Sequence, residues 1–255
     1  GQDGATRAYV GQRVELAGAS LDVQAQATDH ATSDMLVVSI GAVGGSGAFA
    51  TTRSDGDVEA FIGSSPAESG ATGQPLALTG AVTVQATGSE TLNATATGGS
   101  GGGIAIAGMT ATSTSASDLR AYLAAGAGLS AGGLTVKADA PVRAADARIV
   151  VGSAGIAGGA GGKAQADSEG SVQAFLGSDA TVVSPTGNVL IQARNADSHA
   201  HATARGGAGG RIPRNRRARS GARANRHVAR RDGQRDLHAR SPPAAWRVAF
   251  RALRG

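Results

Sequence analysis

Apolar and polar residues alternate along most of the first 210 residues of the chain. In the segment KAQADSEGSVQAFLG (163–177), Ala164, Ala166 and Ala174 fall on one face, whereas Gln165 and Asp167 fall on the other. A period of two residues is typical of a strand with one buried face, and glycine is too frequent here for stable helices. The pattern predicts an all-β region.

The alternation slips by one residue within the segment 134–151. Leu134 and Val136 share a phase that continues to Val142, after which Ala145 and Ala147 occupy the apolar positions. An extra residue in one strand moves every later side chain to the opposite face. The slip therefore predicts a β-bulge, or a corner between two strands.

Four short segments have nearly the same sequence: RAYVG (7–11), VEAFIG (58–63), LRAYLA (119–124) and VQAFLG (172–177). Each carries one ring, and Tyr9, Phe61, Tyr122 and Phe175 are four of the seven aromatic residues of the chain. Their spacings of 52, 61 and 53 residues predict four imperfect repeats of about 53 residues within 1–210.

A second landmark follows each aromatic segment: LDVQAQ, VTVQAT, LTVKAD and VLIQAR, anchored by Val23, Val84, Val136 and Ile191. The longest gap between the two landmarks contains the extra segment SSPAESGATGQP, where a surface loop would tolerate an insertion. A glycine-rich stretch comes next in every copy, and it predicts a tight bend or a close approach to a neighbouring backbone.

Such a repeat cannot bury its apolar face alone, so neighbouring repeats must stack. The favoured architecture is a β-solenoid resembling a parallel β-helix, with two or three coils per repeat; the alternative is a meander of long antiparallel strands. The four rings are out of phase with the apolar face, and in a solenoid they would form a column. That column either stacks on sugars or a partner, or packs beneath a neighbouring layer and holds the repeats in register.

Composition limits the core and the chemistry. The 255 residues include 40 glycines and only 3% aromatics, which predicts a thin core of small side chains. Cysteine is absent, which excludes disulfides and cysteine-ligated metals and suits export through a secretion pore. No apolar run is long enough to predict a membrane span. The chain begins inside a repeat, which predicts a fragment of a longer protein.

The charge is divided unevenly along the chain. Residues 1–210 hold 8 Arg and 2 Lys against 17 acidic residues, whereas residues 211–255 hold 14 Arg, no Lys and 2 Asp. The segment 211–255 also lacks both landmarks, so it forms a separate non-repeat tail that we expect to be disordered or irregular. It is interpreted as the product of a shifted reading frame in a GC-rich gene, with a nucleic-acid arm or a membrane-surface arm as alternatives.

No motif predicts a catalytic or metal site. The run GGAGGKA (158–164) lacks the first glycine and the final Ser or Thr of a phosphate-binding loop, and the glycine-rich bends lack the Asp of calcium-binding repeats. His199 and His201 share a strand face but have no third ligand in sequence, and Asp55 with Asp57 is interpreted as a polar strand face. We expect no cofactor and no enzymatic activity.

The two landmarks and the glycine-rich stretch together resemble the repeats of very large bacterial surface adhesins of the filamentous haemagglutinin and leukotoxin-like family, over residues 1–210. Ala124 stands where the other three copies have glycine. The resemblance implies an extracellular or cell-surface fibre that contacts host cells, other bacteria or polysaccharide. The alternatives are a carbohydrate-binding or carbohydrate-active β-helix and, from the tail alone, a nucleic-acid binder.

Overall fold

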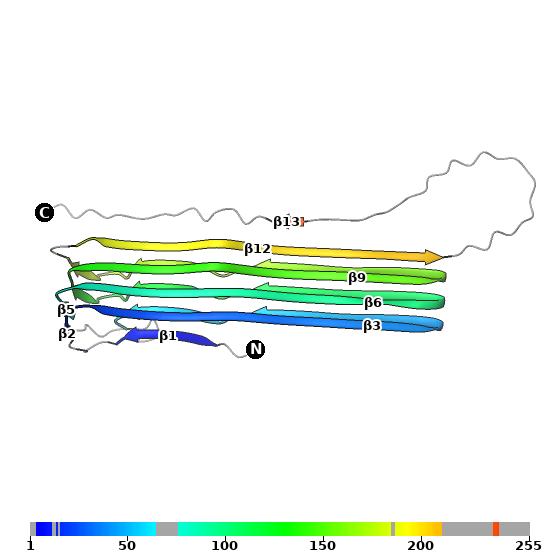
Figure 1. The fold of residues 1–255 in the computed structure, drawn as a ribbon, viewed down its shortest axis with the longest axis horizontal. Coiled ribbons are helices and arrows are strands. Elements are labelled where there is room, and N and C mark those ends of the chain that lie inside the picture. The colour runs from blue at the N-terminus through cyan, green and yellow to red at the C-terminus, as the bar shows by residue number, and fades with distance from the viewer. Residues whose placement is uncertain are drawn as a thin grey trace, which may run out of the picture.

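The computed structural model describes residues 4–11, 14, 16–64, 76–184, 187–210 and 237–239. All regular structure in these segments is β, and none of them contains a helix. The all-β prediction is therefore confirmed. The strands form three sheets, which together make one elongated body (Figure 1).

Two of the sheets are built from short strands. The first sheet has the order β1-β4-β7-β10, with bounds Ala5–Val10, Asp57–Ile62, Leu119–Leu123 and Val172–Leu176. The second sheet has the order β11-β8-β5-β2, with bounds Thr181–Val183, Gly128–Ser130, Leu76–Leu78 and Ala17–Gly18. The alternation and the repeat landmarks in the sequence do not predict these last four strands.

The third sheet is built from long strands and has the order β13-β12-β9-β6-β3. Their bounds are Leu237–Ala239, Val189–Gly210, Gly133–Ser168, Ala81–Ser115 and Leu21–Ser54. Every strand pair among β1–β12 is parallel, and only β13 pairs in the antiparallel direction. The antiparallel meander considered above is therefore wrong for this chain.

The chain makes four successive passes, each formed by two short strands and one long strand: pass 1 (β1–β3), pass 2 (β4–β6), pass 3 (β7–β9) and pass 4 (β10–β12). Each sequence period thus gives one wide pass rather than the two or three coils expected from sequence. Tyr9 pairs with Phe61, Phe61 with Tyr122, and Tyr122 with Phe175, so equivalent residues lie directly above one another.

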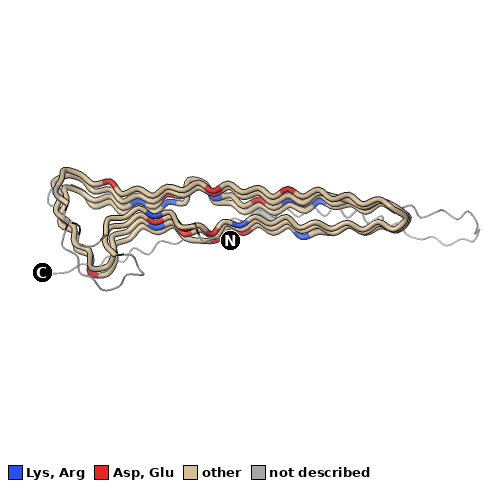
Figure 2. The backbone as a smooth tube through the Cα atoms, turned by 90° about the horizontal axis from the view of Figure 1, so that it is seen from below, with Lys and Arg blue, Asp and Glu red and all other residues tan. Residues whose placement is uncertain are grey.

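The long strands of passes 1 to 3 run out from a broad base and then return towards it (Figure 2). Side chains 25 residues apart in one strand consequently meet: the Ser54 hydroxyl donates to Asp29 at 2.7 Å, and the Ser115 hydroxyl donates to Glu90. We call the two halves the outgoing arm and the return arm. The space between the arms is narrow, which suits the Ala- and Gly-rich sequence.

The bend between the arms coincides with the glycine-rich stretches. Gly41, Gly102, Gly155 and Gly210 pair in register across the four passes. Gly102 has φ +148°, and a Cβ atom there would overlap the carbonyl oxygen of Gly41. Glycine is required at this position both for the backbone conformation and for the close approach of the neighbouring pass.

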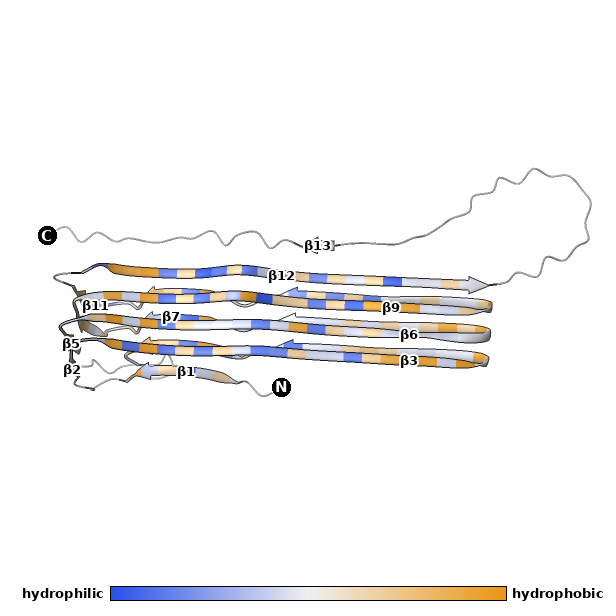
Figure 3. Ribbon diagram, viewed as in Figure 1, coloured by the Kyte–Doolittle hydropathy of each residue, from blue (hydrophilic) through white to orange (hydrophobic). Residues whose placement is uncertain are grey.

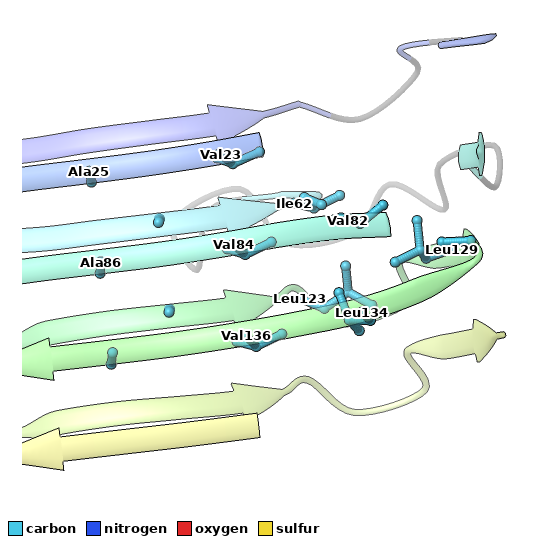
Figure 4. Packing of buried hydrophobic residues seen from close by; sticks show 14 of the residues in the cluster. Val23, Ala25, Ile62, Val82, Val84, Ala86, Leu123, Leu129, Leu134 and Val136 are labelled. Carbon is cyan, nitrogen blue, oxygen red and sulfur yellow. The ribbon is translucent and has the colours of Figure 1, made fainter. Parts of the chain in front are cut away.

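The main core lies at the base, between the outgoing arms and the first two sheets. Val84 and Val136 extend from the outgoing arms among Ile62 and Leu123 of the short strands (Figure 4). A second cluster, made largely of alanines with Met109 and a few branched side chains, fills the space between the arms. Ile191, the fourth landmark residue, is 43% exposed because β12 lies near the edge of its sheet.

The predicted slip in the segment 134–151 is a bulge within a single strand. Thr87 of β6 pairs with Asp139 of β9, but Glu90 pairs with Arg143, so β9 contains one extra residue between these points. The next strand, β12, keeps a constant register with β9 across this region. The bulge therefore separates passes 1 and 2 from passes 3 and 4.

Two predictions concern residues that are largely outside the described part of the chain. The inserted segment SSPAESGATGQP occupies 64–75, of which the structure describes Ser64 alone. Of the Arg-rich tail it describes only β13, whose residues Leu237–Ala239 pair with Ala200–Ala202 of β12.

Candidate functional site: a column of rings and charges

The four repeated aromatic residues form one continuous stack. The ring centroids of Tyr9 and Phe61 are 5.0 Å apart, those of Phe61 and Tyr122 are 5.0 Å apart, and those of Tyr122 and Phe175 are 4.9 Å apart. The interplanar angles are 4°, 6° and 3° in the same order. The spacing matches the distance between neighbouring strands, so the parallel register itself places the rings face to face.

Solvent exposure differs between the two inner rings of the stack, Phe61 and Tyr122, and the two outer rings, Tyr9 and Phe175. Phe61 is 1% exposed and Tyr122 is 2% exposed, whereas Tyr9 is 60% exposed and Phe175 is 36% exposed. The outer rings belong to the first and fourth strands of their sheet, so each has a ring neighbour on one face only among the residues that the structure describes. The inner rings have no free face on which a sugar could stack.

The rings lie on the opposite face of their strands from the main core. Ala60 and Ile62, on either side of Phe61, belong to the core cluster at the base, whereas Phe61 and Tyr122 form a separate small cluster with Ala124. The turn after β4 is tight at this point: Gly63 has φ +108°, and a Cβ atom there would lie 2.8 Å from Cβ of Ala124.

A ladder of charged side chains runs beside the rings on β1, β4 and β7, two residues earlier on each strand. Arg7 Nε donates to Glu59 Oε2 at 2.9 Å, and Arg120 Nη1 donates to Glu59 Oε1 at 3.3 Å. Alternating basic and acidic residues on neighbouring strands are visible in Figure 2. Glu59 is buried and holds one arginine on each side, and Gln173 occupies the equivalent position in pass 4.

The phenol of Tyr122 has a raised pKa. Burial is the main cause that raises the pKa of Tyr122 to about 12; the nearby Glu59 carboxylate contributes to the rise, and Arg120 and Arg7 partly oppose it. Its hydroxyl is buried and has no hydrogen-bond partner among the described residues. The phenol is therefore neutral at ordinary pH and is unsuited to act as a base or a nucleophile.

Aspartates at the start of the short strands bind the backbone of the next pass. Asp57 Oδ1 accepts from the backbone N–H of Asp118 at 3.2 Å, and Asp118 Oδ1 accepts from the backbone N–H of Ser171 at 2.8 Å. Asp118 also forms an ion pair with Arg120. These carboxylates join successive passes at a corner, which gives Asp57 a more specific role than the polar strand face predicted from sequence.

A second polar column lies inside the molecule, between the outgoing and return arms. Asp29, Glu90, Arg143 and Ser198 pair in register along the four passes. The buried Arg143 side chain donates to the carbonyl oxygens of Ser117 and Glu169. Sequence reasoning missed this column, although Glu90 has the same phase as the apolar Leu92 and could have been recognised as inward-facing.

A cavity of about 390 Å³ opens where this inner column reaches pass 1. Asp29, Ser54, Asp57, Val58 and Leu92 are among the residues that line it. Since the column continues on the other side of Asp29 with Glu90, the cavity is the open end of the space between the arms.

The two histidines lie on β12 and contact different carboxylates. His199 Nδ1 is 3.3 Å from Asp197 Oδ1, and His201 Nδ1 is 3.8 Å from Asp146 Oδ1. Within the described segments, no three His, Cys, Asp or Glu side chains are grouped so as to hold a metal ion. The glycine-rich run 158–164 lies within β9, in the return arm of pass 3.

Apolar side chains are exposed near the bend, mainly on pass 1. They include Leu36, Val38 and Ile40 on the outgoing arm and Val43 and Phe49 on the return arm. Figure 3 shows apolar colouring at this end of β3 and β6. We call the five residues of pass 1 the bend patch.

Comparison with known proteins returns no match: no family model, no curated protein and no solved structure is similar to this chain. In the part of the chain that the structure describes, no helix has the length and apolar character needed to cross a membrane.

Proposed function

We propose that residues 1–210 are a β-solenoid repeat region of a secreted or surface-displayed bacterial adhesin-like protein, with a structural and adhesive role. The observation that supports this most is the register: rings, charges and bend glycines each recur at equivalent positions in successive passes. An architecture of this kind gains length by adding passes, which suits a stalk that holds a binding surface away from a cell.

The solenoid is tested by removing one whole period. Val58 pairs with Leu119, 61 residues later, so deletion of 58–118 joins equivalent points of two passes. The shortened chain is expected to fold cooperatively with an unchanged β-sheet spectrum. A matched deletion of 58–88 joins points that are not equivalent, and it is expected to abolish cooperative unfolding. Equal behaviour of the two deletions would contradict the solenoid.

The bend patch is the surface that we propose for adhesion, because it combines exposed apolar side chains with a scarcity of charge at the end furthest from the base. Beads coated with the chain are expected to be retained by cultured epithelial cells or by bacterial cells more than beads coated with albumin. Replacing Leu36 and Ile40 by Ser should reduce retention, whereas Val183→Ser, an exposed apolar position at the base, should not. Retention no greater than that of albumin would contradict the adhesive role.

A carbohydrate-binding or carbohydrate-active β-helix has less support. Stacking on sugars needs exposed ring faces, but Phe61 and Tyr122 are buried and covered on both faces by neighbouring rings. Asp57 and Asp118 are occupied with backbone N–H groups. Nucleic-acid binding would depend on the Arg-rich tail, and salt-sensitive DNA binding that is lost on deletion of 211–255 would be needed to support it.

A further inference from the structure

Each end of the ring stack has an exposed ring face on which another ring could stack. Tyr9 at one end and Phe175 at the other each present one ring face without a stacking partner among the described residues. The strands that carry them, β1 and β10, are the two edge strands of the first sheet. In Figure 1 the first and fourth passes lie on opposite sides of the body.

Within the described segments, the backbone of β1 has unpaired groups at one edge. The carbonyl oxygens of Gly4 and Val10 accept from the N–H groups of Asp57 and Gly63, so residues of even number in this strand face β4. Backbone groups alternate in direction along a strand. The N–H and C=O groups of odd-numbered residues, including Tyr9, therefore face the open edge.

The backbone of β10 presents the matching groups at the other edge. The carbonyl oxygen of Ser171 accepts from the N–H of Leu119, and the N–H of Gly177 donates to the carbonyl oxygen of Leu123. Residues of odd number in this strand therefore face β7. Even-numbered residues such as Ala174 face outward. When Phe175 of one copy is placed over Tyr9 of another, Ala174 lies over Ala8. The outward-facing N–H and C=O groups of Ala174 then lie between Arg7 and Tyr9, whose backbone groups face them. This is the arrangement that joins neighbouring passes within one copy.

Side chains also match when pass 4 is placed on pass 1. Gln173 comes over Arg7, where its amide oxygen can accept from a guanidinium that is half exposed. Ser198 comes over Asp29 at the open cavity, where its hydroxyl can donate to the carboxylate. Neither contact opposes two like charges, and both continue a column that already runs through the molecule.

The outline of a pass favours this head-to-tail arrangement over a symmetric pairing of two first passes. Each pass has a broad base at one end and a narrow bend at the other (Figure 2). Only a translation along the stack keeps base over base and outgoing arm over outgoing arm for the length of β12, which ends at the bend with Gly210. A heterologous contact of this kind leaves a free end on each copy, and it generates filaments.

We propose that pass 4 of one copy stacks on pass 1 of a second copy in the parallel register used within the chain, and that β13 competes for the same edge. The strand β13 pairs with Ala200–Ala202 on the outer side of β12, where a second copy would lie. It thereby protects part of an edge that would otherwise bind another chain. The inference does not depend on the adhesive role.

The test uses the full-length chain in sedimentation velocity and negative-stain electron microscopy over a wide range of concentration. His238→Pro removes a backbone N–H from β13, so this variant is expected to associate more strongly than the unaltered chain and to form rods that lengthen with concentration. In the His238→Pro background, Tyr9→Lys and Phe175→Asp should each weaken association at least tenfold. The two together should recover much of it, because the new charges attract only across the interface between copies.

The two altered rings lie at opposite ends of one copy, so a recovery in the double variant cannot arise within a single molecule. Phe49→Lys is the matched control, since Phe49 is 77% exposed and lies outside the ring stack. Far-UV circular dichroism checks that each variant retains its β structure. A single species at all concentrations with His238→Pro would overturn the proposal, and so would association that is insensitive to Tyr9→Lys and Phe175→Asp.

Discussion

Phe61 and Tyr122 are 61 residues apart in sequence, yet their rings lie parallel with centroids 5.0 Å apart and are almost completely buried. Neither ring contributes to the main core of the molecule. They join passes 2 and 3 on the opposite face of the sheet, so the structure has a second apolar column outside its core.

Removal of one of the buried rings, Phe61 or Tyr122, should strongly lower the free energy of unfolding. Tyr122→Ala is expected to lower the free energy of unfolding by about 3–5 kcal/mol, because it removes a buried ring together with two stacking contacts. Phe49→Ala, at an exposed aromatic position, should change it by about 0.5 kcal/mol or less. Urea denaturation followed by circular dichroism measures both. Similar values for the two variants would show that the stack does not stabilise the fold.

The hydroxyl of Tyr122 should be dispensable. Tyr122→Phe keeps the ring and removes a buried polar atom that has no hydrogen-bond partner among the described residues. We expect the free energy of unfolding at neutral pH to stay the same or to rise by about 1 kcal/mol. A clear loss of stability in the same urea experiment would mean that the hydroxyl makes a favourable contact.

Stability should also fall in alkali because of this residue. The pKa of Tyr122 is raised in the folded protein from 10.0 to about 12, so between these values the unfolded chain loses its phenolic proton more readily than the folded chain. The contribution of the protonated Tyr122 phenol to the free energy of unfolding is fully present below pH 10, and it is lost as the pH rises towards 12. Tyr122→Phe should remove this part of the pH dependence, which a denaturation series from pH 8 to pH 12 would detect as a difference in slope.

The charge ladder should depend most on its central member. Glu59→Ala leaves both Arg7 and Arg120 without their shared partner, whereas Arg7→Ala removes only one contact, from a side chain that is half exposed. We expect Glu59→Ala to cost about 2–3 kcal/mol and Arg7→Ala about 1 kcal/mol or less. Thermal and urea denaturation give the order of the two effects. The reverse order would show that Glu59 is not the residue that holds the ladder together.

Alanine substitutions at Gly102 and Gly108, two glycines of β6, should differ in their effect on the free energy of unfolding. Gly102→Ala places a Cβ atom on the carbonyl oxygen of Gly41 and requires φ +148°, so it should destabilise the fold by more than about 2 kcal/mol. Gly108→Ala has open space around its Cβ and should be tolerated. Equal effects in urea denaturation would mean that the close approach of passes 1 and 2 can relax.

Alternation in the sequence was sufficient to predict the β class, the phase of the apolar positions and the bulge near Asp139, because these depend on local spacing alone. It did not predict the short strands of the second sheet. The sequence also identified Tyr9, Phe61, Tyr122 and Phe175 as equivalent positions. It could not predict that one sequence period forms a single pass, because that depends on where the long strand folds back on itself.

The inner polar column was missed for a different reason. Glu90 and Arg143 are charged, yet they occupy the phase of the buried positions in their strands. Burial of such groups is acceptable only where hydrogen-bond partners exist, and those partners come from the return arm and from other passes. A single strand examined alone contains no information about them. The exposure of Ile191 likewise depends on its place near the edge of the sheet, not on its sequence context.

The hydrogen bonds between parallel strands lie roughly across the strand direction, so in this molecule they run along the direction in which the passes are stacked. Tension applied evenly along that direction loads all the bonds between two long strands at once, and the pass separates only when the whole row yields. A force applied at the bend loads the same bonds one after another, starting from the glycine column. The molecule should therefore be mechanically anisotropic, strong against uniform pulling and weak against peeling from its narrow end.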